Sequence, residues 1–333
     1  MFNMKFIKLF VIFILICAAG FGVAAGASLL SGGSLSVVRA AANRDQYHAQ
    51  QYAAAASTTS LSIVFAGDIM LDRNVYRAIL RDNKNFAHPF LRIDELLSNF
   101  DLRVANLEGP FTAAAFNMKR AEAMSFTFDS GFAPELAKRF DVVSLANNHT
   151  YNFNEKGLAS TKDILKKNGT QYFGDPLNRV GLIGTIIEKN GFKIGVVGYH
   201  AFAGPEAQNI PNVVAAIKAL RPKVDFLVVM PHWGVEYKPK PSLSQIAAGH
   251  AFILAGADAV IGGHPHVVET VEQYKGHPIY YSMGNFIFDQ YFSPETQRGI
   301  LVHVALNRVD GRVVPMYETI PYQISGESQP FLP

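Results

Sequence analysis

The chain carries the stretch Gly256-Ala257-Asp258-Ala259-Val260-Ile261-Gly262-Gly263-His264-Pro265-His266, in which a short apolar strand runs directly into a polar loop. Glycines 262 and 263 permit a close approach of another backbone, because glycine has no side chain to clash. The two imidazoles that follow are separated by one proline, which makes them a stiff pair. The stretch therefore predicts a strand whose end holds a ligand.

Four earlier apolar segments end in the same way, in clusters of Asp, Asn, Glu or His. They are residues 61–66 before Gly67-Asp68, 102–105 before Asn106-Leu107-Glu108, 142–146 before Asn147-Asn148-His149, and 224–230 before Pro231-His232. In open α/β sheets, ligands bind beyond the carboxyl ends of the strands. We therefore expect the polar groups of all five strand ends to meet in one place.

Helical patterns lie between several of these strands, at residues 93–100, 134–140, 156–167 and 243–255. Strands that alternate with helices predict a mainly parallel sheet covered on both faces. Three hairpins interrupt the alternation, with turns at Asn190-Gly191, Lys275-Gly276 and Asp310-Gly311. They suggest a second, partly antiparallel sheet packed on the first. The predicted fold is an α/β, four-layer α/β/β/α sandwich.

Composition excludes some classes of protein. The 333 residues include 30 basic and 27 acidic side chains, and a net charge of +3 is too small to indicate a nucleic-acid partner. Cys17 is the only cysteine, and it lies in the apolar N-terminal run. The following domain can therefore contain neither a disulfide nor a thiolate metal ligand.

The N-terminus predicts export. Lys5 and Lys8 precede an apolar run over residues 9–30, which is long enough for a single membrane span with the lysines on the cytoplasmic side. Small residues at 23–27 also allow cleavage as a signal peptide. We expect a signal-anchor or signal peptide at 1–30, a linker at 31–60 and one domain at 61–333. The protein would cross the cell membrane once, with its domain on the extracellular side, or it would be secreted if the signal is cleaved.

The strand-end residues form a ligand set for a divalent metal. Imidazoles with carboxylate or carboxamide oxygens suit Mn, Zn or Fe, and we expect one or two ions. The predicted ligands are Asp68, Glu108, Asn148, His149, His232, His264 and His266. Asn106 and Glu108 share one face of their strand, because side chains alternate with a period of two.

The same cluster offers catalytic and substrate-binding groups. Glu108 could ligate, bridge two metals or act as a base, and His149 or His266 could protonate a leaving group. Arg73 could pair with an anionic substrate group, and Asn285 could contact the ligand or orient a loop. Trp233 forms either a pocket wall or core. The other histidines, at positions 48, 88, 200, 250, 277 and 303, are interpreted as surface or packing residues.

Six ordered motifs between residues 61 and 290 resemble the CapA family of poly-γ-glutamate capsule biosynthesis. They are residues 65–71 (FAGDIML), 106–110 (NLEGP), 144–149 (SLANNH), 232–237 (HWGVEY), 256–266 (GADAVIGGHPH) and 282–286 (SMGNF). That family is similar in turn to calcineurin-like metallophosphatases, which bind two metals. The resemblance implies a calcineurin-like metallophosphatase fold, with the predicted ligands in matching order.

Three residues depart from the pattern of these families. Metallophosphatases usually have His where this chain has Met70 and Asp where it has Glu108, and the CapA family commonly has Asp where it has Asn152. The first departure removes one metal ligand and leaves the number of ions open.

The resemblance implies a role in making, exporting or retaining poly-γ-glutamate at the cell surface, alongside membrane-bound synthesis proteins. The residues themselves support a metallohydrolase site acting on an anionic polymer or a phosphoester. Two alternatives are a generic exported metallophosphoesterase and a catalytically silent scaffold that binds polymer.

Overall fold

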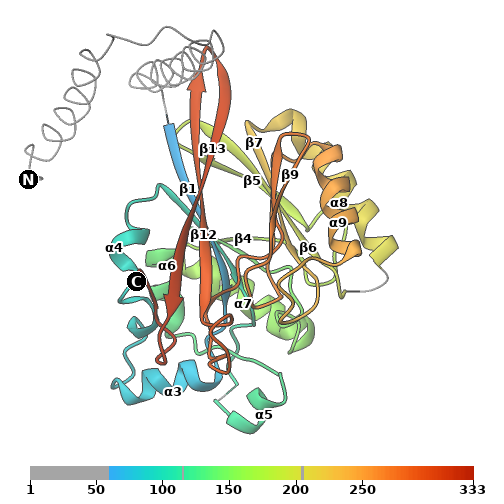
Figure 1. The fold of residues 1–333 in the computed structure, drawn as a ribbon. Helices are drawn as coiled ribbons and strands as arrows, with labels where there is room; N and C mark the ends of the chain where they lie inside the picture. Colours follow the sequence, from blue (N-terminus) through green and yellow to red (C-terminus); the bar gives the residue numbers. More distant parts are fainter. Residues whose placement is uncertain (1–59, 115, 204–205) are drawn as a thin grey trace, which may run out of the picture. The chain divides into compact units, whose positions relative to one another are not determined.

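The computed structural model describes residues 60–114, 116–203 and 206–333 (Figure 1). The chain divides into two compact units, residues 1–56 and 57–333, and the described residues all lie in the second unit. The predicted N-terminal segment 1–30 and nearly all of the linker lie outside the described residues. Among the residues that are described, no helix is long and apolar enough to cross a bilayer.

The first sheet combines a parallel half with an antiparallel half. Its strands are β1 (Ser60–Ile69), β2 (Leu102–Leu107), β3 (Val142–Ser144), β4 (Gln171–Phe173), β11 (Asn285–Ile287), β12 (Arg298–Val309), β13 (Arg312–Ile324) and β14 (Pro330–Phe331). The order is β14-β13-β12-β1-β2-β3-β4, and β11 also pairs with β1. Strands β1 to β4 are mutually parallel, whereas β12 runs antiparallel to β1.

The second sheet contains six strands in the order β5-β6-β7-β8-β10-β9. They are β5 (Gly184–Lys189), β6 (Phe192–His200), β7 (Phe226–His232), β8 (Ala259–Ile261), β9 (Val271–Tyr274) and β10 (His277–Tyr280). Strands β6, β7, β8 and β10 are parallel, and each edge strand is attached by an antiparallel hairpin.

Helices cover the outer face of each sheet (Figure 1). They are α3 (Arg73–Arg81), α4 (Asp94–Leu97), α5 (Met118–Glu122), α6 (Phe132–Arg139), α7 (Asn154–Asn168), α8 (Glu206–Leu220) and α9 (Leu243–Ala255), with 3₁₀ turns at His88–Phe90 and Arg221–Lys223. Helix α9 begins with a capping box of Ser242 and Gln245, and it is capped after Ala255 by Gly256, whose φ of 114° favours glycine.

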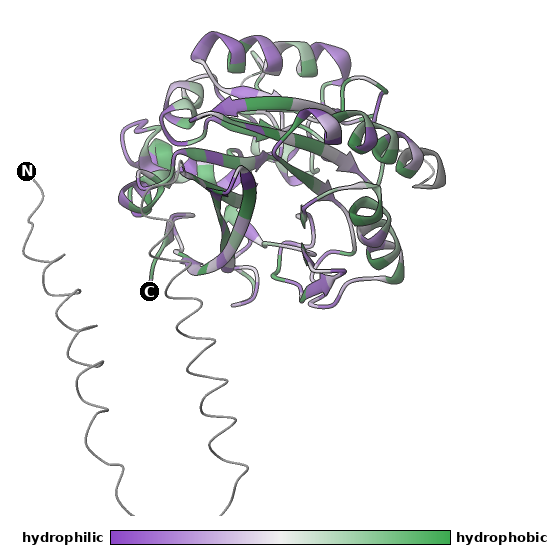
Figure 2. Cartoon of the chain, turned by 90° about the horizontal axis from the view of Figure 1, so that it is seen from above, coloured by the Kyte–Doolittle hydropathy of each residue, from purple (hydrophilic) through white to green (hydrophobic). Residues whose placement is uncertain are grey.

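Three hydrophobic clusters hold these layers together. One contains Phe65, Val104 and Val228 and lies between the two sheets. A second joins the first sheet to helices α3, α4, α6 and α7, and a third joins the second sheet to α8 and α9. Figure 2 shows apolar residues concentrated along the strands, while the outer helices carry both polar and apolar residues. This is the pattern expected where only one face of a helix is buried.

The mixed α/β class and the two mixed sheets agree with the sequence prediction, but the division of strands does not. The five strands predicted for one sheet are shared: β1, β2 and β3 lie in the first sheet, and β7 and β8 in the second. The prediction that all three hairpins build the second sheet was wrong, because β12 and β13 join the first sheet beside β1. Each sheet is consequently covered by helices on one face and by the other sheet on the opposite face.

A bulge in β1 sets the direction of Asp68. Phe65 packs between the sheets and Ala66 packs beneath the helices, so strict alternation would turn Asp68 toward the helices. Pairing with β2 skips Gly67, however, and Asp68 lies opposite Asn106. The extra residue reverses the alternation, as β-bulges do, and Asp68 faces the second sheet.

Only glycine fits at this bulge. A Cβ atom on Gly67 would lie 1.9 Å from the carbonyl oxygen of Gly284, which precedes β11. The close approach lets β11 pair with the end of β1, where Asp68 lies opposite Asn285. The bulge therefore brings both Asp68 and Asn285 to the edge where the two sheets meet.

Candidate metal centre

The polar ends of strands from both sheets converge between the sheets, as the sequence predicts. Asp68 is the last residue but one of β1, Glu108 follows β2, His232 ends β7, and His264 and His266 follow β8. All five side chains are buried. The cluster thus joins groups that are far apart in sequence, and the hydrogen bond between Asp68 and His264 spans 196 residues.

Asp68 is held by two donors. The Asn106 amide Nδ2–H donates to its Oδ1 at 2.8 Å, and the His264 backbone N–H donates to its Oδ2 at 3.1 Å. The His266 Nδ1 atom lies 3.6 Å from Oδ2, and the His232 Nδ1 atom lies 3.9 Å from Oδ1. Burial raises the pKa of Asp68 to about 6, although both hydrogen bonds oppose this shift.

Glu108 is fully buried, yet neither of its carboxylate oxygens has a hydrogen-bond partner among the described residues. Its Oε1 atom lies 3.9 Å from Nε2 of His232, 3.9 Å from Nε2 of His266 and 4.0 Å from Nε2 of His149. Burial raises the pKa of Glu108 well above its ordinary value, and the charges of Asp68 and Glu236 add to the shift. A buried acid without partners costs free energy that a bound cation would offset.

His232 lies at the centre of the donor set. Its Nε2 atom is 2.8 Å from Oδ1 of Asn148 and 3.2 Å from Nδ1 of His264. Its Nδ1 atom is 3.3 Å from Nδ2 of Asn106, the same amide that donates to Asp68. The predicted ligands Asn148, His232 and His264 are therefore in mutual contact.

Neighbouring amides fix the tautomers of two further histidines. The Asn285 Nδ2 amide donates to Gln290 and to the Thr296 carbonyl, so its Oδ1 must accept from Nδ1–H of His266 at 2.9 Å. His266 therefore presents the lone pair of Nε2 to Glu108.

A carboxamide oxygen also orients the ring of His149. The Oδ1 atom of Asn152 accepts the Phe126 backbone N–H, and it also accepts from Nδ1–H of His149 at 3.2 Å. The Nε2 lone pair of His149 thus faces Glu108 at 4.0 Å.

The imidazoles are in the neutral form that binds metals. Burial lowers the pKa of His149 to about 4 and that of His264 to about 3. Burial also lowers the pKa values of His232 and His266 well below the ordinary value, and the nearby imidazoles add to the effect.

Two groups of side chains have ligand atoms close enough to hold an ion. The first group is Asp68, Glu108 and His232, and the second is Glu236, His264 and His266. Within each group all ligand atoms lie within 4.8 Å of one another. The nitrogen and oxygen donors and the unpartnered Glu108 fit a divalent cation of the Mn, Zn or Fe type.

The sequence prediction did not select Glu236, and it interpreted His200 as a surface or packing residue. Glu236 stands in the 232–237 motif, but its loop has no strand pattern to give it a direction. His200 ends β6 and pairs in register with His232. It is buried, its Nδ1–H donates to the Pro176 carbonyl at 2.7 Å, and its Nε2 has no partner in the described part of the chain. The strand-end rule that selected His232 would also have selected His200.

Two of the predicted substrate-binding residues lie in different surroundings. Arg73 is mostly buried near the cluster, where its guanidinium pairs with Asp289 at 2.5 Å and lies 5.0 Å from the ring of Phe126. Its charge opposes the rise in the pKa of Glu108. Trp233 is not brought to the cluster, because it follows His232 and faces the opposite side of the sheet, where it packs in the core against Phe252.

Asn285, the third such residue, is fully buried and contacts His266. Its amide is engaged by three hydrogen bonds, so it orients the imidazole.

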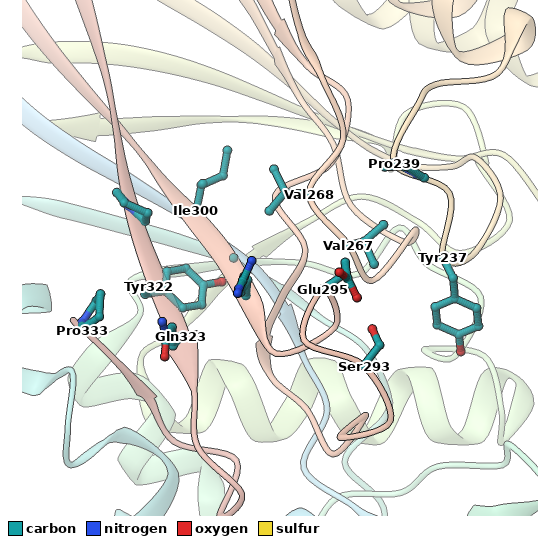
Figure 3. Close-up of a pocket in the computed structure, with 13 residues that line it drawn as sticks. Tyr237, Pro239, Val267, Val268, Ser293, Glu295, Ile300, Tyr322, Gln323 and Pro333 are labelled. Atoms are coloured by element: carbon teal, nitrogen blue, oxygen red, sulfur yellow. The ribbon is translucent and has the colours of Figure 1, made fainter.

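A groove of about 510 Å³ is lined by residues of the loops that follow β7 and β8 and of strands β12 and β13 (Figure 3). Tyr237 and Val267, which line it, are the chain neighbours of Glu236 and His266. Glu295, Arg298 and Gln323 add polar groups to a wall that is otherwise largely apolar.

Comparison with known proteins finds relatives among bacterial capsule proteins. The family model described as "Bacterial capsule synthesis protein PGA_cap" matches residues 62–290. The chain is 31% identical over 249 residues to the capsule biosynthesis protein CapA of Bacillus anthracis, covering 69% of this chain and 60% of that relative. It is 29% identical over 292 residues to the PGA biosynthesis protein CapA of Bacillus subtilis (strain 168), covering 80% and 75%.

The chain therefore spans less than two thirds of the length of the Bacillus anthracis relative. Among solved structures, a hypothetical protein from Thermus thermophilus superposes with a TM-score of 0.48 at 16% identity, covering 79% of this chain and 99% of that one.

Proposed function

The chain belongs to the bacterial capsule synthesis family PGA_cap, and on that premise we propose that it takes part in making, exporting or retaining poly-γ-glutamate at the cell surface. We further propose that it does so through a metal-dependent, hydrolase-like site. The relatives named for capsule and PGA biosynthesis support the first part, and the strand-end cluster supports the second.

The proposal includes a calcineurin-like metallophosphatase arrangement of the fold. It is supported by two facing sheets with helices outside, and by ligands that follow β1, β2, β3, β7 and β8 in chain order. Sites of this kind bind their ligand beyond the carboxyl ends of parallel strands.

The observation that carries the proposal is Glu108. A carboxylate with no exposure and no partner among the described residues lies about 4 Å from three imidazoles. The Nε2 atoms of His149 and His266 carry lone pairs and cannot donate to this carboxylate, whereas a bound cation would satisfy the carboxylate and both nitrogens. When bound, a divalent cation of the Mn, Zn or Fe type would polarise a phosphoryl or acyl oxygen and activate water.

The chain's own residues provide the proton transfer. The Nε2 atoms of His149 and His266 face the cluster, and each ring is fixed by an Nδ1–H bond to a carboxamide oxygen. Because burial lowers the pKa of His149 to about 4, its neutral Nε2 could accept the proton that an attacking water releases and then pass that proton to the leaving group. Arg73 lies close enough to attract an anionic substrate.

Localisation and partners follow the same reasoning. We propose that residues 1–30 place the domain on the outer side of the cell membrane, as a single-pass anchor or, if cleaved, as a signal for secretion. The partners would be membrane-bound polymer synthesis proteins and an anionic polymer or phosphoester, with no nucleic acid.

A gene deletion in a polymer-producing strain tests this function. Wild-type protein should restore surface polymer, whereas Glu108→Gln and His264→Ala should not. His277→Gln, whose histidine lies on β10 outside the cluster, is the matched control. Unchanged surface polymer in the deletion strain would sink the capsule role.

Met70 favours a second candidate, a catalytically silent scaffold that binds polymer. It stands where metallophosphatases usually have an imidazole, and its Sδ accepts the Asp72 backbone N–H at 3.1 Å. A scaffold would bind polymer in the presence of EDTA, and the Glu108→Gln variant would restore surface polymer as well as wild type does.

A further inference from the structure

We propose that Gln290 is a positioning residue that ties Tyr237, in the wall of the groove, to His266 through one directed chain of hydrogen bonds. The chain holds the ring proton of His266 on Nδ1. Its effect on metal binding rests on the proposed metal site, whereas its direction is a property of the metal-free protein. Gln290 and Tyr237 both lie outside the strand-end cluster.

Three hydrogen bonds make up the chain. The Nδ1–H of His266 donates to Oδ1 of Asn285 at 2.9 Å, and the Nδ2 amide of Asn285 donates to Oε1 of Gln290 at 3.0 Å. The Nε2 amide of Gln290 then donates to the phenol oxygen of Tyr237 at 3.1 Å. Asn285 and Gln290 are both buried. Water is therefore poorly placed to replace a lost partner, and such buried bonds are costly to break.

A backbone carbonyl fixes the direction of the chain. The Nδ2 amide of Asn285 has two hydrogens, and the one not given to Gln290 is donated to the Thr296 carbonyl at 3.0 Å. A carbonyl can only accept, so Oδ1 of Asn285 must face His266. For the same reason Oε1 of Gln290 faces the Asn285 amide, and Nε2 of Gln290 faces Tyr237.

The other end of the chain has the same direction. The phenol oxygen of Tyr237 accepts from Gln290, so its own proton must go to a different acceptor. Burial raises the pKa of Tyr237 to about 12, and the charge of Glu236 and its hydrogen bond with the phenol add to the shift. Each member thus donates to the next, from the imidazole of His266 to the carboxylate of Glu236. Hydrogen bonds that point the same way strengthen one another.

Tyr237 brings this chain to the groove. It lines the groove (Figure 3) and is 43% exposed. The ring of Phe292 packs edge-on against it, with 5.1 Å between centroids. Gln290 and Phe292 belong to one loop, which the Thr296 hydroxyl closes by donating to the Gln290 carbonyl at 2.6 Å. A ligand in this part of the groove would therefore contact the phenol on which Gln290 depends.

Nitrogen NMR of the metal-free protein tests the direction of the chain. The full-length protein is labelled with nitrogen-15 in its histidine rings and kept in EDTA at pH 7, where the buried imidazoles are neutral. Long-range proton–nitrogen spectra then show which ring nitrogen carries the proton, and loss of signals in His266→Gln identifies those of His266. Wild type should carry this proton on Nδ1.

Variants of Gln290 test its positioning role. Gln290→Leu cannot accept from Asn285, and it should show a mixture of the two His266 tautomers. Its affinity for Mn²⁺, measured by titration calorimetry, should fall at least about tenfold. Gln290→Glu keeps an acceptor toward Asn285 and should retain the wild-type tautomer. Gln323→Leu replaces a glutamine of the groove wall outside the chain and is the matched control.

A variant of Tyr237 tests the link to the groove. Tyr237→Phe keeps the ring that packs on Phe292 but removes the acceptor of Gln290. It should populate the second tautomer of His266, although less than Gln290→Leu does. A wild-type tautomer and an unchanged Mn²⁺ affinity in Tyr237→Phe would show that the chain ends at Gln290, and would overturn the link.

The remaining outcomes separate this proposal from the proposed function. A proton on Nε2 of His266 in wild type would overturn the direction of the chain. Equal tautomer signals in wild type and Gln290→Leu would overturn the role of Gln290, as would a mixture of tautomers in Gln290→Glu. If Gln290→Leu does not fold, which shifts in all histidine signals would reveal, the Gln290→Glu and Tyr237→Phe variants still decide. Absence of Mn²⁺ binding in wild type would overturn the metal site and leave the tautomer result standing.

Discussion

Mild acid should destabilise the metal-free protein, because unfolding frees buried imidazoles to take up protons. Burial lowers the pKa of His149 and His200 to about 4 and that of His264 to about 3, against an ordinary value of 6.5. Between pH 6.5 and 4 the unfolded chain therefore binds more protons than the folded protein. Stability is full above pH 6.5 and falls as the pH falls through this window.

The loss can be worked from these values. Between pH 7 and pH 5, each of the three histidines removes about 2 kcal/mol of stability. Asp68 has the opposite sign: its folded pKa is raised to about 6, so the same acidification restores about 1 kcal/mol. Glu269 has the same sign, because burial raises its folded pKa to about 7, and it restores about 2 kcal/mol more. The net loss from these groups is about 2–3 kcal/mol, with His232 and His266 adding to it and Glu108 opposing it.

Urea unfolding of the protein in EDTA at pH 7, 6 and 5 measures this loss. The variant His200→Gln should reduce the loss by about 2 kcal/mol, because it removes one buried imidazole. His277→Gln should leave the loss unchanged, since His277 lies outside the cluster. Equal or greater stability at pH 5 than at pH 7 would refute the picture of buried neutral histidines.

Three other changes have defined outcomes. Glu108→Gln should raise the melting temperature of the metal-free protein at pH 7, because it removes an acid whose charge is disfavoured by burial. The variant should also lack the further rise in melting temperature that Mn²⁺ gives to the wild-type protein. Calorimetry measures both effects, and a lower melting temperature in the metal-free variant would argue against an unpartnered acid. Asn285→Ala removes the acceptor for Nδ1–H of His266 and should weaken Mn²⁺ binding about 10–100-fold by titration calorimetry; an unchanged Kd would count against a positioning role. Gly67→Ala should lower the free energy of unfolding, measured in urea, by at least about 1–3 kcal/mol, because the new Cβ meets the Gly284 carbonyl oxygen. An unchanged free energy of unfolding would show that the bulge can shift freely.

The sequence predicted the elements that have strong local signals. The bounds of β8 and α9 agree with the prediction, because glycines follow both elements and Ser242 caps the helix. The gathering of carboxylates and imidazoles at strand ends was also predictable, since it depends only on the direction of parallel strands. His200 obeys the same rule, although the sequence analysis interprets it as a surface or packing residue.

Other features depend on pairing between distant segments. Nothing local to β12 shows that it pairs with β1 rather than with the second sheet. The direction of Asp68 depends on a bulge at Gly67 that becomes necessary only when Gly284 lies against it. Glu236 lies in a loop, and its direction is set by a hydrogen bond from its neighbour to Pro265. Local periodicity contains none of this information.

The contact between Asp68 and the His264 backbone spans 196 residues, and this separation has a consequence for the living cell. At ordinary rates of translation His264 is made roughly 10–40 s after Asp68, so the growing chain passes through a long period in which no complete ligand set exists. A cation can be captured only once the last third of the domain has emerged and folded. Any ion that this cluster binds is therefore selected by the compartment in which that final step takes place, and by the metals available there.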